Sequence, residues 1–457
     1  MTEEDGTTLS DLDEVMKDGT CTTLGEVMHL ENKRPRPSPH PALSYLKPSP
    51  PLVGQSLYLG GENGPDGLIY CIPGHATRVL QINPFNDECI QIGPEFVGKF
   101  KWLRGIQASN GIMYGLPCNA PSVLRIDARN KSCSSDIEIT TLELPYHTLV
   151  EDDTKEQERQ RTIPWKYHGG SISPVDDCIY CIPQSATRVL RIDPQTDECT
   201  FVGPRLPGKY KWYGGVVGKD GAIYGTPHNS QAVLRICPRK NQDGSVVVDV
   251  QLVGDLGDAS HQWHGAGVSS DGTIVCIPAN TPRVLLITPP IDIKDPPTLE
   301  VLGDEGVVAT GENAGRPDRK YKYLGAVSDP NNNVYCLPSG TERVLRVNTQ
   351  TKTIDEIGPS LYVSGMERLK QNKWQNGFYC PKSECIYAIP LAAETVLKID
   401  LKHGHENGDP VVSTMGLPAE PFGGLAKWEG GVMAETGVMY CMPNNFKRVL
   451  RIEPMTI

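Results

Sequence analysis

Short apolar runs separated by turn residues recur along most of the chain, and helical periodicity is nearly absent from residue 51 onward. In one unit, "YGGVV" (213–217) is followed by "GKDG", whose Asp-Gly pair is a turn signal, and then by "AIYGTP" and "AVLRI" (232–236). A proline ends the second run, because proline cannot donate to a β-ladder. In the preceding unit, "DPQTDE" leads into a fourth run, "CTFVG" (199–203). The pattern predicts units of four short strands.

The unit repeats, and the proline that ends its second strand is the most regular marker. Successive markers are 44 to 66 residues apart, with insertions in the longer copies. The markers are Pro73, Pro117, Pro183, Pro227, Pro278, Pro338, Pro390 and Pro443. Four strands per unit over eight copies is typical of β-propeller blades. We therefore predict an all-β fold that is a single β-propeller of eight four-stranded blades, with seven as the alternative.

The two ends of the repeat array predict how the ring closes. The last copy lacks a fourth strand, and "PPLVGQSLYLGG" (50–61) aligns with a fourth strand that leads into a first strand. We expect the segment around Leu52 and Val53 to supply the outer strand of the final blade, which leaves no open edge. Residues 1–49, which are acidic and then proline-rich, are expected to be a disordered tail before a propeller at 50–457.

Composition narrows the classes of partner and compartment. The formal net charge of −11 argues against a general nucleic-acid binder, because a polyanion would repel the protein. No apolar run approaches the roughly 18 residues of a membrane span, and the N-terminus has no signal-peptide core. Cysteine shares one repeat position with glycine and alanine, which indicates small buried thiols in a reducing compartment. We expect a cytoplasmic monomer, with the nucleus as the alternative, that needs no cofactor and contacts neither nucleic acid nor membrane.

Two repeated phrases are expected on one face of the propeller, because loops from fourth to first strands and from second to third strands share that face. One phrase places an aromatic residue, commonly after lysine, before the first strand, and the other places arginine after the marker proline. In an acidic protein such a rim is a candidate site for an anionic ligand or an acidic peptide. The candidate rim consists of Lys101, Trp102, Lys211, Trp212, Trp263, Lys373, Trp374, Lys427, Trp428, His75, Arg78, Arg188, Arg283, Arg343 and Arg448.

A structural interpretation competes with this rim. A tryptophan repeated at one position of the blades is typical of blade-to-blade packing, and an asparagine after proline suits a tight left-handed turn. The expected tyrosine equivalents of the tryptophans are Tyr58, Tyr167 and Tyr321. Departures from the repeat are better candidates for function, and the histidines that depart are His75, His168, His228, His261 and His264. Because no ligand spacing fixes these histidines together, we predict neither a metal site nor catalytic residues.

The repeat resembles a known kind of unit. The phrase "KWxGGV…DGxIYxIPxxAxxVLxIDPxTxxCxxVG" covers most of the chain and is similar to a propeller repeat of uncharacterised algal and protist proteins, often labelled kelch-like or WD40-like. The sequence departs from both reference patterns. It lacks the Trp-Asp ending of WD40 blades, and its Gly-Gly pair falls in the inner strand and not in the second strand as in kelch blades. The resemblance implies the fold and no particular activity.

Three functions are consistent with these observations. The favoured one is a non-enzymatic binding or scaffold protein that presents a propeller face to a protein or peptide partner, an acidic one among them, or to an anionic ligand. The alternative is a metal-assisted hydrolase or lactonase-like enzyme with its site at the channel mouth. The glycine-rich, apolar inner strands count against that enzyme. A third is the sensing of a small anion or carbohydrate through the Lys, Trp and Arg rim.

Overall fold

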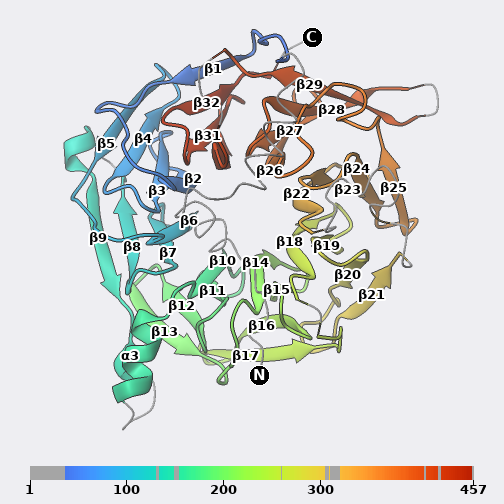
Figure 1. Ribbon diagram of the computed structural model, residues 1–457. Helices are drawn as coiled ribbons and strands as arrows, with labels where there is room; N and C mark the ends of the chain where they lie inside the picture. Colours follow the sequence, from blue (N-terminus) through green and yellow to red (C-terminus); the bar gives the residue numbers. More distant parts are fainter. Residues whose placement is uncertain are drawn as a thin grey trace, which may run out of the picture.

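The computed structural model describes residues 36–129, 133–148, 154–258, 260–303, 308, 320–405, 408–419 and 424–454. Within these ranges the chain forms eight four-stranded antiparallel sheets, which are arranged as blades around a central axis (Figure 1). The predicted all-β propeller of eight blades is therefore confirmed. The first strand of each blade is innermost and the fourth is outermost. Residues 1–35, the larger part of the expected tail, lie outside the described residues.

Blades 1 to 4 follow one another in chain order. Blade 1 contains β2 (Tyr58–Asn63), β3 (Ile69–Pro73), β4 (Val79–Asn83) and β5 (Glu88–Ile92). Blade 2 contains β6 (Trp102–Gln107), β7 (Met113–Pro117), β8 (Ser122–Asp127) and β9 (Glu138–Glu143). Blade 3 contains β10 (Tyr167–Ile172), β11 (Ile179–Pro183), β12 (Val189–Asp193) and β13 (Glu198–Val202). Blade 4 contains β14 (Trp212–Val217), β15 (Ile223–Pro227), β16 (Val233–Lys240) and β17 (Val246–Val253).

Blades 5 to 8 complete the ring. Blade 5 contains β18 (Trp263–Val268), β19 (Ile274–Pro278), β20 (Val284–Thr288) and β21 (Thr298–Leu302). Blade 6 contains β22 (Tyr323–Ser328), β23 (Asn333–Pro338), β24 (Val344–Asn348) and β25 (Thr353–Ile357). Blade 7 contains β26 (Trp374–Cys380), β27 (Cys385–Pro390), β28 (Thr395–Gly404) and β29 (Pro410–Gly416). Blade 8 contains β30 (Trp428–Met433), β31 (Met439–Pro443), β32 (Val449–Ile452) and β1 (Leu43–Leu46).

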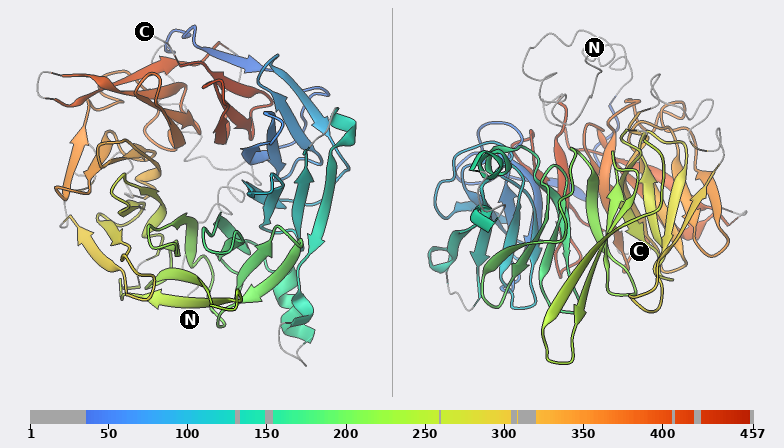
Figure 2. Two further views of the ribbon diagram at one scale, coloured as in Figure 1. Left: turned by 180° about the vertical axis from the view of Figure 1, so that it is seen from behind. Right: turned by 90° about the horizontal axis from the view of Figure 1, so that it is seen from below.

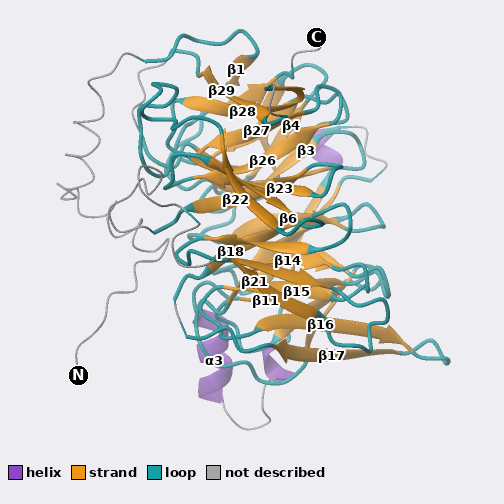
Figure 3. Cartoon of the chain, turned by 90° about the vertical axis from the view of Figure 1, so that its right-hand side faces the viewer, coloured by secondary structure: helices purple, strands orange, loops and turns teal. Residues whose placement is uncertain are grey.

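Helix in the described part of the chain is confined to two connections, one within blade 2 and one between blades 2 and 3. The short helix η1 (Ser134–Asp136) lies in the β8–β9 connection of blade 2, whereas the short helix η2 (Tyr146–Thr148) and the helix α3 (Thr154–Thr162) lie between blades 2 and 3, with α3 at the edge of the disc (Figures 1 and 3). In the residues that the structure describes, no helix has the length and apolar character needed to cross a membrane. A long hairpin, β16–β17, extends beyond the disc (Figure 2).

The core lies between successive blades. Second strands such as β3 are buried at every position, because both faces of a blade are covered by its neighbours. In one cluster Ile72 of blade 1 packs with Trp102 and Leu124 of blade 2. The repeated small position fits this packing, since a side-chain carbon added to Gly115 would lie 2.9 Å from Cβ of Leu124. The cysteines of this position are buried with free thiols, and they are Cys71, Cys181, Cys276, Cys336 and Cys441.

The ring closes through the N-terminal segment, as expected, but through an earlier part of it. Strand β1 pairs with β32 in antiparallel register, with Leu43 opposite Ile452. The predicted location around Leu52 and Val53 is wrong, and Val53 is 86% exposed. The physical reason is the prolines at positions 48, 50 and 51, which cannot donate to a ladder. The same segment also bridges Pro39 to Gly416 of β29 and Ser49 to Ile90 of β5, so it spans blades 7, 8 and 1.

Candidate ligand-binding site at the axial end of the first strands

The predicted rim lysines connect adjacent blades. Their ammonium groups are buried and donate to backbone carbonyls of the preceding blade: Nζ of Lys101 lies 2.8 Å from the oxygens of both Gly74 and Ala76. Nζ of Lys211 similarly lies 2.9 Å from the oxygen of Ala186. The buried lysines at this position are Lys101, Lys166, Lys211, Lys322, Lys373 and Lys427. Each ammonium group holds two blades together through backbone atoms.

The five tryptophans begin the first strands and are also buried. The indole N–H of Trp212 donates to the oxygen of Ala232 at 2.8 Å, and the other tryptophans do the same about twenty residues along the chain. These residues are Trp102, Trp212, Trp263, Trp374 and Trp428. In blade 6 the equivalent is Tyr323, so the expectation for Tyr321 is wrong by two positions. The tryptophans bond within their own blades and pack against the preceding one.

The predicted arginines lie toward the outer strands. The guanidinium groups of Arg78, Arg188 and Arg343 donate to a carbonyl just after the fourth strand of the same blade. Arg283 is exposed, and the backbone oxygen of Arg448 accepts the indole N–H of Trp428. These contacts support the structural interpretation of the repeated arginines. Ligand binding by the Lys, Trp and Arg rim stays a prediction.

A second ring of residues lies two positions before each tryptophan or its tyrosine equivalent. All eight have left-handed backbones with φ between 46° and 58°, and they are Ser56, Phe100, Trp165, Tyr210, His261, Tyr321, Asn372 and Ala426. This conformation costs a side-chain-bearing residue about 1 kcal/mol or more, and asparagine or glycine tolerates it best. Only one of the eight is asparagine, whereas blades 2 to 6 carry five consecutive aromatic rings. We call these five residues the aromatic arc.

The asparagines that follow the marker prolines hold this ring in place. Oδ1 of Asn119 accepts the backbone N–H of Trp165 in the next blade at 2.8 Å. Oδ1 of Asn229 accepts the N–H of His261 at 2.8 Å. In return, the N–H of Asn229 donates to the oxygen of Tyr210 in its own blade. These asparagines therefore have a structural role, as the sequence favoured. The left-handed residue, however, is the one that the asparagine contacts in the next blade and not the asparagine itself.

The residue directly after each tryptophan or tyrosine forms an inner ring. The eight members are buried, and they are Leu59, Leu103, His168, Tyr213, His264, Leu324, Gln375 and Glu429. The ring of Tyr213 stacks between two histidines, with centroid distances of 3.6 Å to His168 and 3.8 Å to His264. On the other side of the axis, Nε2 of Gln375 donates to Glu429 at 3.2 Å. The inner ring therefore has an aromatic sector in blades 3 to 5 and a carboxylate in blade 8.

A pocket separates the aromatic arc from the aromatic sector of the inner ring. Its walls include Trp165, Tyr210 and Tyr321 of the arc and Tyr213 and His264 of the inner ring. Gln184, His228 and His261 complete it. The space that a water-sized molecule can occupy inside it measures about 30 Å³. We call it the aromatic pocket.

The aromatic pocket contains buried polar atoms that have no hydrogen-bond partner. They are Oε1 of Gln184, Oη of Tyr213 and Nε2 of His261, and Nδ1 of the stacked His168 is unpartnered beside them. All four side chains belong to residues that are less than 9% exposed. An unsatisfied buried polar group costs about 1–3 kcal/mol, so four of them at one place mark a site that a ligand or ordered water would satisfy.

Burial controls the charges around the pocket. It lowers the pKa of His264 to about 3, assisted by the positive charge of Arg104 on β6, and it lowers the pKa of His168 and His228 as well. These histidines are neutral at neutral pH. Burial raises the pKa of Glu429 to about 7, while Arg104 opposes the rise. The pocket is therefore a neutral aromatic surface close to one guanidinium group.

The histidines do not form a metal-binding set. The rings of His228 and His261 lie 4.4 Å apart, and those of His228 and His264 lie 6.1 Å apart. In the described residues, no three His, Cys, Asp or Glu side chains are placed to hold one metal ion. The structure does bring together four of the histidines that depart from the repeat: His168, His228, His261 and His264. His75 lies at another position, with its ring edge-on to Phe100.

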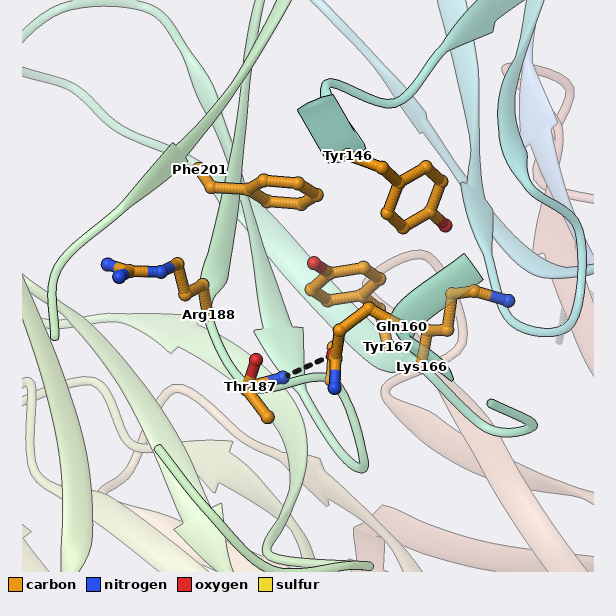
Figure 4. A pocket seen from close by; sticks show the side chains of 8 residues that line it. Tyr146, Gln160, Lys166, Tyr167, Thr187, Arg188 and Phe201 are labelled. Atoms are coloured by element: carbon orange, nitrogen blue, oxygen red, sulfur yellow. Dashed lines mark hydrogen bonds between the residues drawn. The ribbon is translucent and has the colours of Figure 1, made fainter. Parts of the chain in front are cut away.

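A second cavity lies under the insertion between blades 2 and 3 and is not a comparable site (Figure 4). It measures about 10 Å³, which is room for one water molecule. One of its lining side chains, Gln160, is already engaged, because its Oε1 accepts the backbone N–H of Thr187 at 3.1 Å (Figure 4). This cavity is a packing gap that Tyr146, Tyr167 and Phe201 enclose.

The sequence missed the polar members of the pocket other than its histidines. Tyr213, Tyr210 and Gln184 lie within the repeated phrase, beside the Lys-Trp pairs and the marker prolines. The available signal was variation: the positions directly before and after "KW" change residue type from copy to copy, while "KW" itself recurs. Arg104 gave a further signal, because most other copies have glycine at its position.

Comparison with known proteins supports the fold alone. No protein-family model and no curated protein matches the sequence. Among solved structures, Sqt1 of Saccharomyces cerevisiae aligns over 92% of this chain and 100% of its own, with a TM-score of 0.58 and 9% identity. A catalytically inactive virginiamycin B lyase from Staphylococcus aureus, solved with quinupristin, aligns over 90% of this chain and 99% of its own, with a TM-score of 0.49 and 12% identity. The chain is thus a β-propeller, and membership of a kelch-like or WD40-like family stays a prediction.

Proposed function

We propose that the protein is a non-enzymatic binding or scaffold protein that receives an acidic or anionic group of a partner at the axial end of its first strands. The observation that carries this proposal is the aromatic pocket, whose buried atoms Tyr213 Oη, His261 Nε2 and Gln184 Oε1 have no partner. Buried polar groups are normally satisfied, and those that are not commonly mark a functional site. The cytoplasmic location and the monomeric state stay predictions.

The frame around the pocket supports a binding role. Each first strand is joined to the preceding blade by a backbone hydrogen bond, such as the one from Lys211 N to Gln184 O at 2.9 Å. A rigid frame positions loop side chains at little entropic cost on binding. The half-buried rings of Tyr210 and Tyr321 supply contact area of the kind that is enriched at the centres of interfaces.

A capture experiment with matched variants tests the proposal. Full-length protein, a Tyr210→Ala/Tyr321→Ala variant and a Phe85→Ala variant are each immobilised and exposed to extract of the native cell. Phe85 is 67% exposed in the β4–β5 turn on the opposite face, so its loss controls for general surface effects. We expect a partner that the wild type and Phe85→Ala retain and the double variant loses, with thermal unfolding checked for all three. Equal capture by the double variant would overturn the proposal.

A further inference from the structure

The buried lysines of blades 2 to 4, next to the aromatic pocket, contact backbone oxygens and no carboxylate. Nζ of Lys211 contacts the backbone oxygens of Gln184, Ala186 and Gly208 at 2.9 to 3.1 Å. Nζ of Lys101 likewise contacts three backbone oxygens, and Nζ of Lys166 contacts the oxygen of Asn119. Carbonyl oxygens satisfy hydrogen bonding without cancelling a charge. Burial lowers the pKa of Lys101 and Lys166 to about 8 and that of Lys211 to about 7, so at neutral pH Lys101 and Lys166 in particular make the sector of blades 2 to 4 attractive to an anion.

The buried carboxylates that lie near lysines of this ring belong to the other side of the propeller. Glu342 lies 3.9 Å from Lys373, and Glu367 and Glu394 raise the pKa of Lys427 against the lowering effect of its burial. In contrast, no carboxylate contributes to the lowered pKa of Lys101 or Lys211, which burial alone causes. Lys373 and Lys427 therefore have carboxylates nearby, whereas Lys101 and Lys211 have none; Glu429, which interacts with Arg104, is the carboxylate that the inner ring itself contributes. The aromatic pocket lies on the side of the ring where the buried lysines lack carboxylate neighbours.

The unpartnered atoms specify the chemistry of the occupant. Tyr213 Oη carries a hydroxyl proton, and His261 Nε2 can carry one in the neutral imidazole. The amide of Gln184 presents N–H donors to the pocket after a half-turn about its last torsion. Three donors that line one pocket, within electrostatic reach of the Arg104 guanidinium group, suit a group with two acceptor oxygens and a negative charge.

The size of the pocket restricts that group further. About 30 Å³ accommodates two or three water-sized atoms, which matches the two oxygens of one carboxylate and is too small for a whole metabolite. The remainder of the ligand must lie outside, against the rings of Trp165, Tyr210 and Tyr321. Aromatic rings favour an apolar or planar remainder.

We infer that the aromatic pocket binds the carboxylate of a ligand whose adjoining apolar part lies on the aromatic arc. Tyr213, His261 and Gln184 donate to the carboxylate oxygens, and Arg104 supplies the opposite charge. This inference rests on the proposed binding function and makes it specific. The carboxylate belongs either to a small aromatic acid or to the end of a peptide, and the two sources share this chemistry.

Calorimetric titration of the full-length protein with matched probes tests the inference. The probes are phenylacetate and its uncharged counterpart phenylacetamide, followed by a hexapeptide that ends in phenylalanine with a free or an amidated terminus. We expect each acid to bind at least tenfold more tightly than its amide, because a hydrogen bond to a charged group contributes about that factor. Tighter binding of the free peptide than of phenylacetate identifies a peptide as the source, and the reverse identifies a small acid.

Variants separate a binding role from a structural one. Tyr213→Phe removes a hydroxyl without a partner, so the free protein should keep its unfolding temperature or gain stability while phenylacetate binding weakens about tenfold or more. Arg104→Gln should weaken the acids and leave the amides unchanged. Tyr440→Phe is the matched control, since its hydroxyl donates to Asp87, away from the pocket.

Two results would overturn the inference: equal affinity for acid and amide, or unchanged acid binding by both Tyr213→Phe and Arg104→Gln. The outcome of the capture experiment then distinguishes the two failures. If Tyr210→Ala/Tyr321→Ala still loses its partner, the binding function stands and only the carboxylate is wrong. If that variant also captures normally, both fail.

Discussion

Lys211 provides a quantitative test of the blade-to-blade contacts. Its ammonium group is buried against three backbone oxygens, and burial lowers its pKa from 10.5 to about 7. In the unfolded chain the same group keeps its ordinary pKa of about 10.4. Between these two values the unfolded state therefore binds a proton that the folded state has lost. Folding stability must rise with pH in that window through this group.

The size of the rise follows from the two pKa values. Well inside the window the contribution is about 1.4 kcal/mol per pH unit. Integration from pH 7 to pH 9 gives about 2 kcal/mol for a folded pKa of about 7, and about 1 kcal/mol if the folded value is one unit higher. Lys211→Met removes the titrating group and hence the rise. The free energy of unfolding of the wild type minus that of the variant should therefore increase by about 1–2 kcal/mol from pH 7 to pH 9.

Urea unfolding at pH 7, 8 and 9 measures that difference. Comparing wild type with variant cancels the titration of buried thiols and phenols, which both proteins contain. Lys209→Met is the matched control, because Lys209 is exposed two residues away and contacts no buried carbonyl. We expect its difference from wild type to be constant with pH. A constant or shrinking difference for Lys211→Met would refute the assignment of a buried, pKa-lowered lysine between blades 3 and 4.

Three further predictions address closure, the left-handed ring and the thiols. Removal of residues 1–46 should destabilise the protein by at least about 3 kcal/mol in urea unfolding and promote aggregation, because β32 loses its outer partner β1 and the core loses the buried Leu43. Removal of residues 1–35 alone leaves β1 in place and is the control. Asn229→Ala should lower the free energy of unfolding by about 1–3 kcal/mol in the same assay, since the N–H of His261 loses its acceptor. Asn229→Asp retains an oxygen there and should cost less. Equal losses for the two variants would contradict the role of Asn229 as that acceptor. Mild oxidation should form one internal disulfide between Cys380 and Cys385, because these free cysteines lie opposite each other in β26 and β27. Peptide mass mapping should detect this disulfide in the wild type and not in Cys385→Ser, and a different pairing would contradict the register.

The sequence was sufficient for the fold because a copied unit repeats its own evidence. Eight marker prolines, the Asp-Gly turns and the missing fourth strand of the last copy predict blade number and closure together. The closing strand was misplaced because alignment followed the apolar pair Leu52 and Val53. The prolines directly before that pair exclude it from the ladder despite its apolar character, since a β-ladder needs the donor that proline lacks.

The candidate site was only partly predictable, because the direction of a side chain depends on backbone angles that sequence does not show. Lys211 and Trp212 recur in the repeat and looked like a rim, yet both are buried in structural contacts. Tyr210 and Tyr213, on either side of them, line the pocket. Because the backbone of Tyr210 is left-handed, its side chain takes a different direction from those of its neighbours. A tyrosine in a sequence does not indicate a positive φ, since this conformation is uncommon for residues other than glycine and asparagine.

The left-handed ring shows how one backbone geometry serves both stability and binding. The carbonyl and the N–H of Trp165 are used in fixed contacts, the carbonyl by Ser185 of its own blade and the N–H by Asn119 of the preceding blade. Because these contacts use backbone atoms, they do not depend on the side chain, which is free to be serine in blade 1 or alanine in blade 8. The choice of large rings at five consecutive blades, in a conformation that disfavours them, therefore serves something other than closure of the ring. The unpartnered polar atoms beneath those rings indicate what it serves: recognition of a ligand at the pocket that the rings enclose.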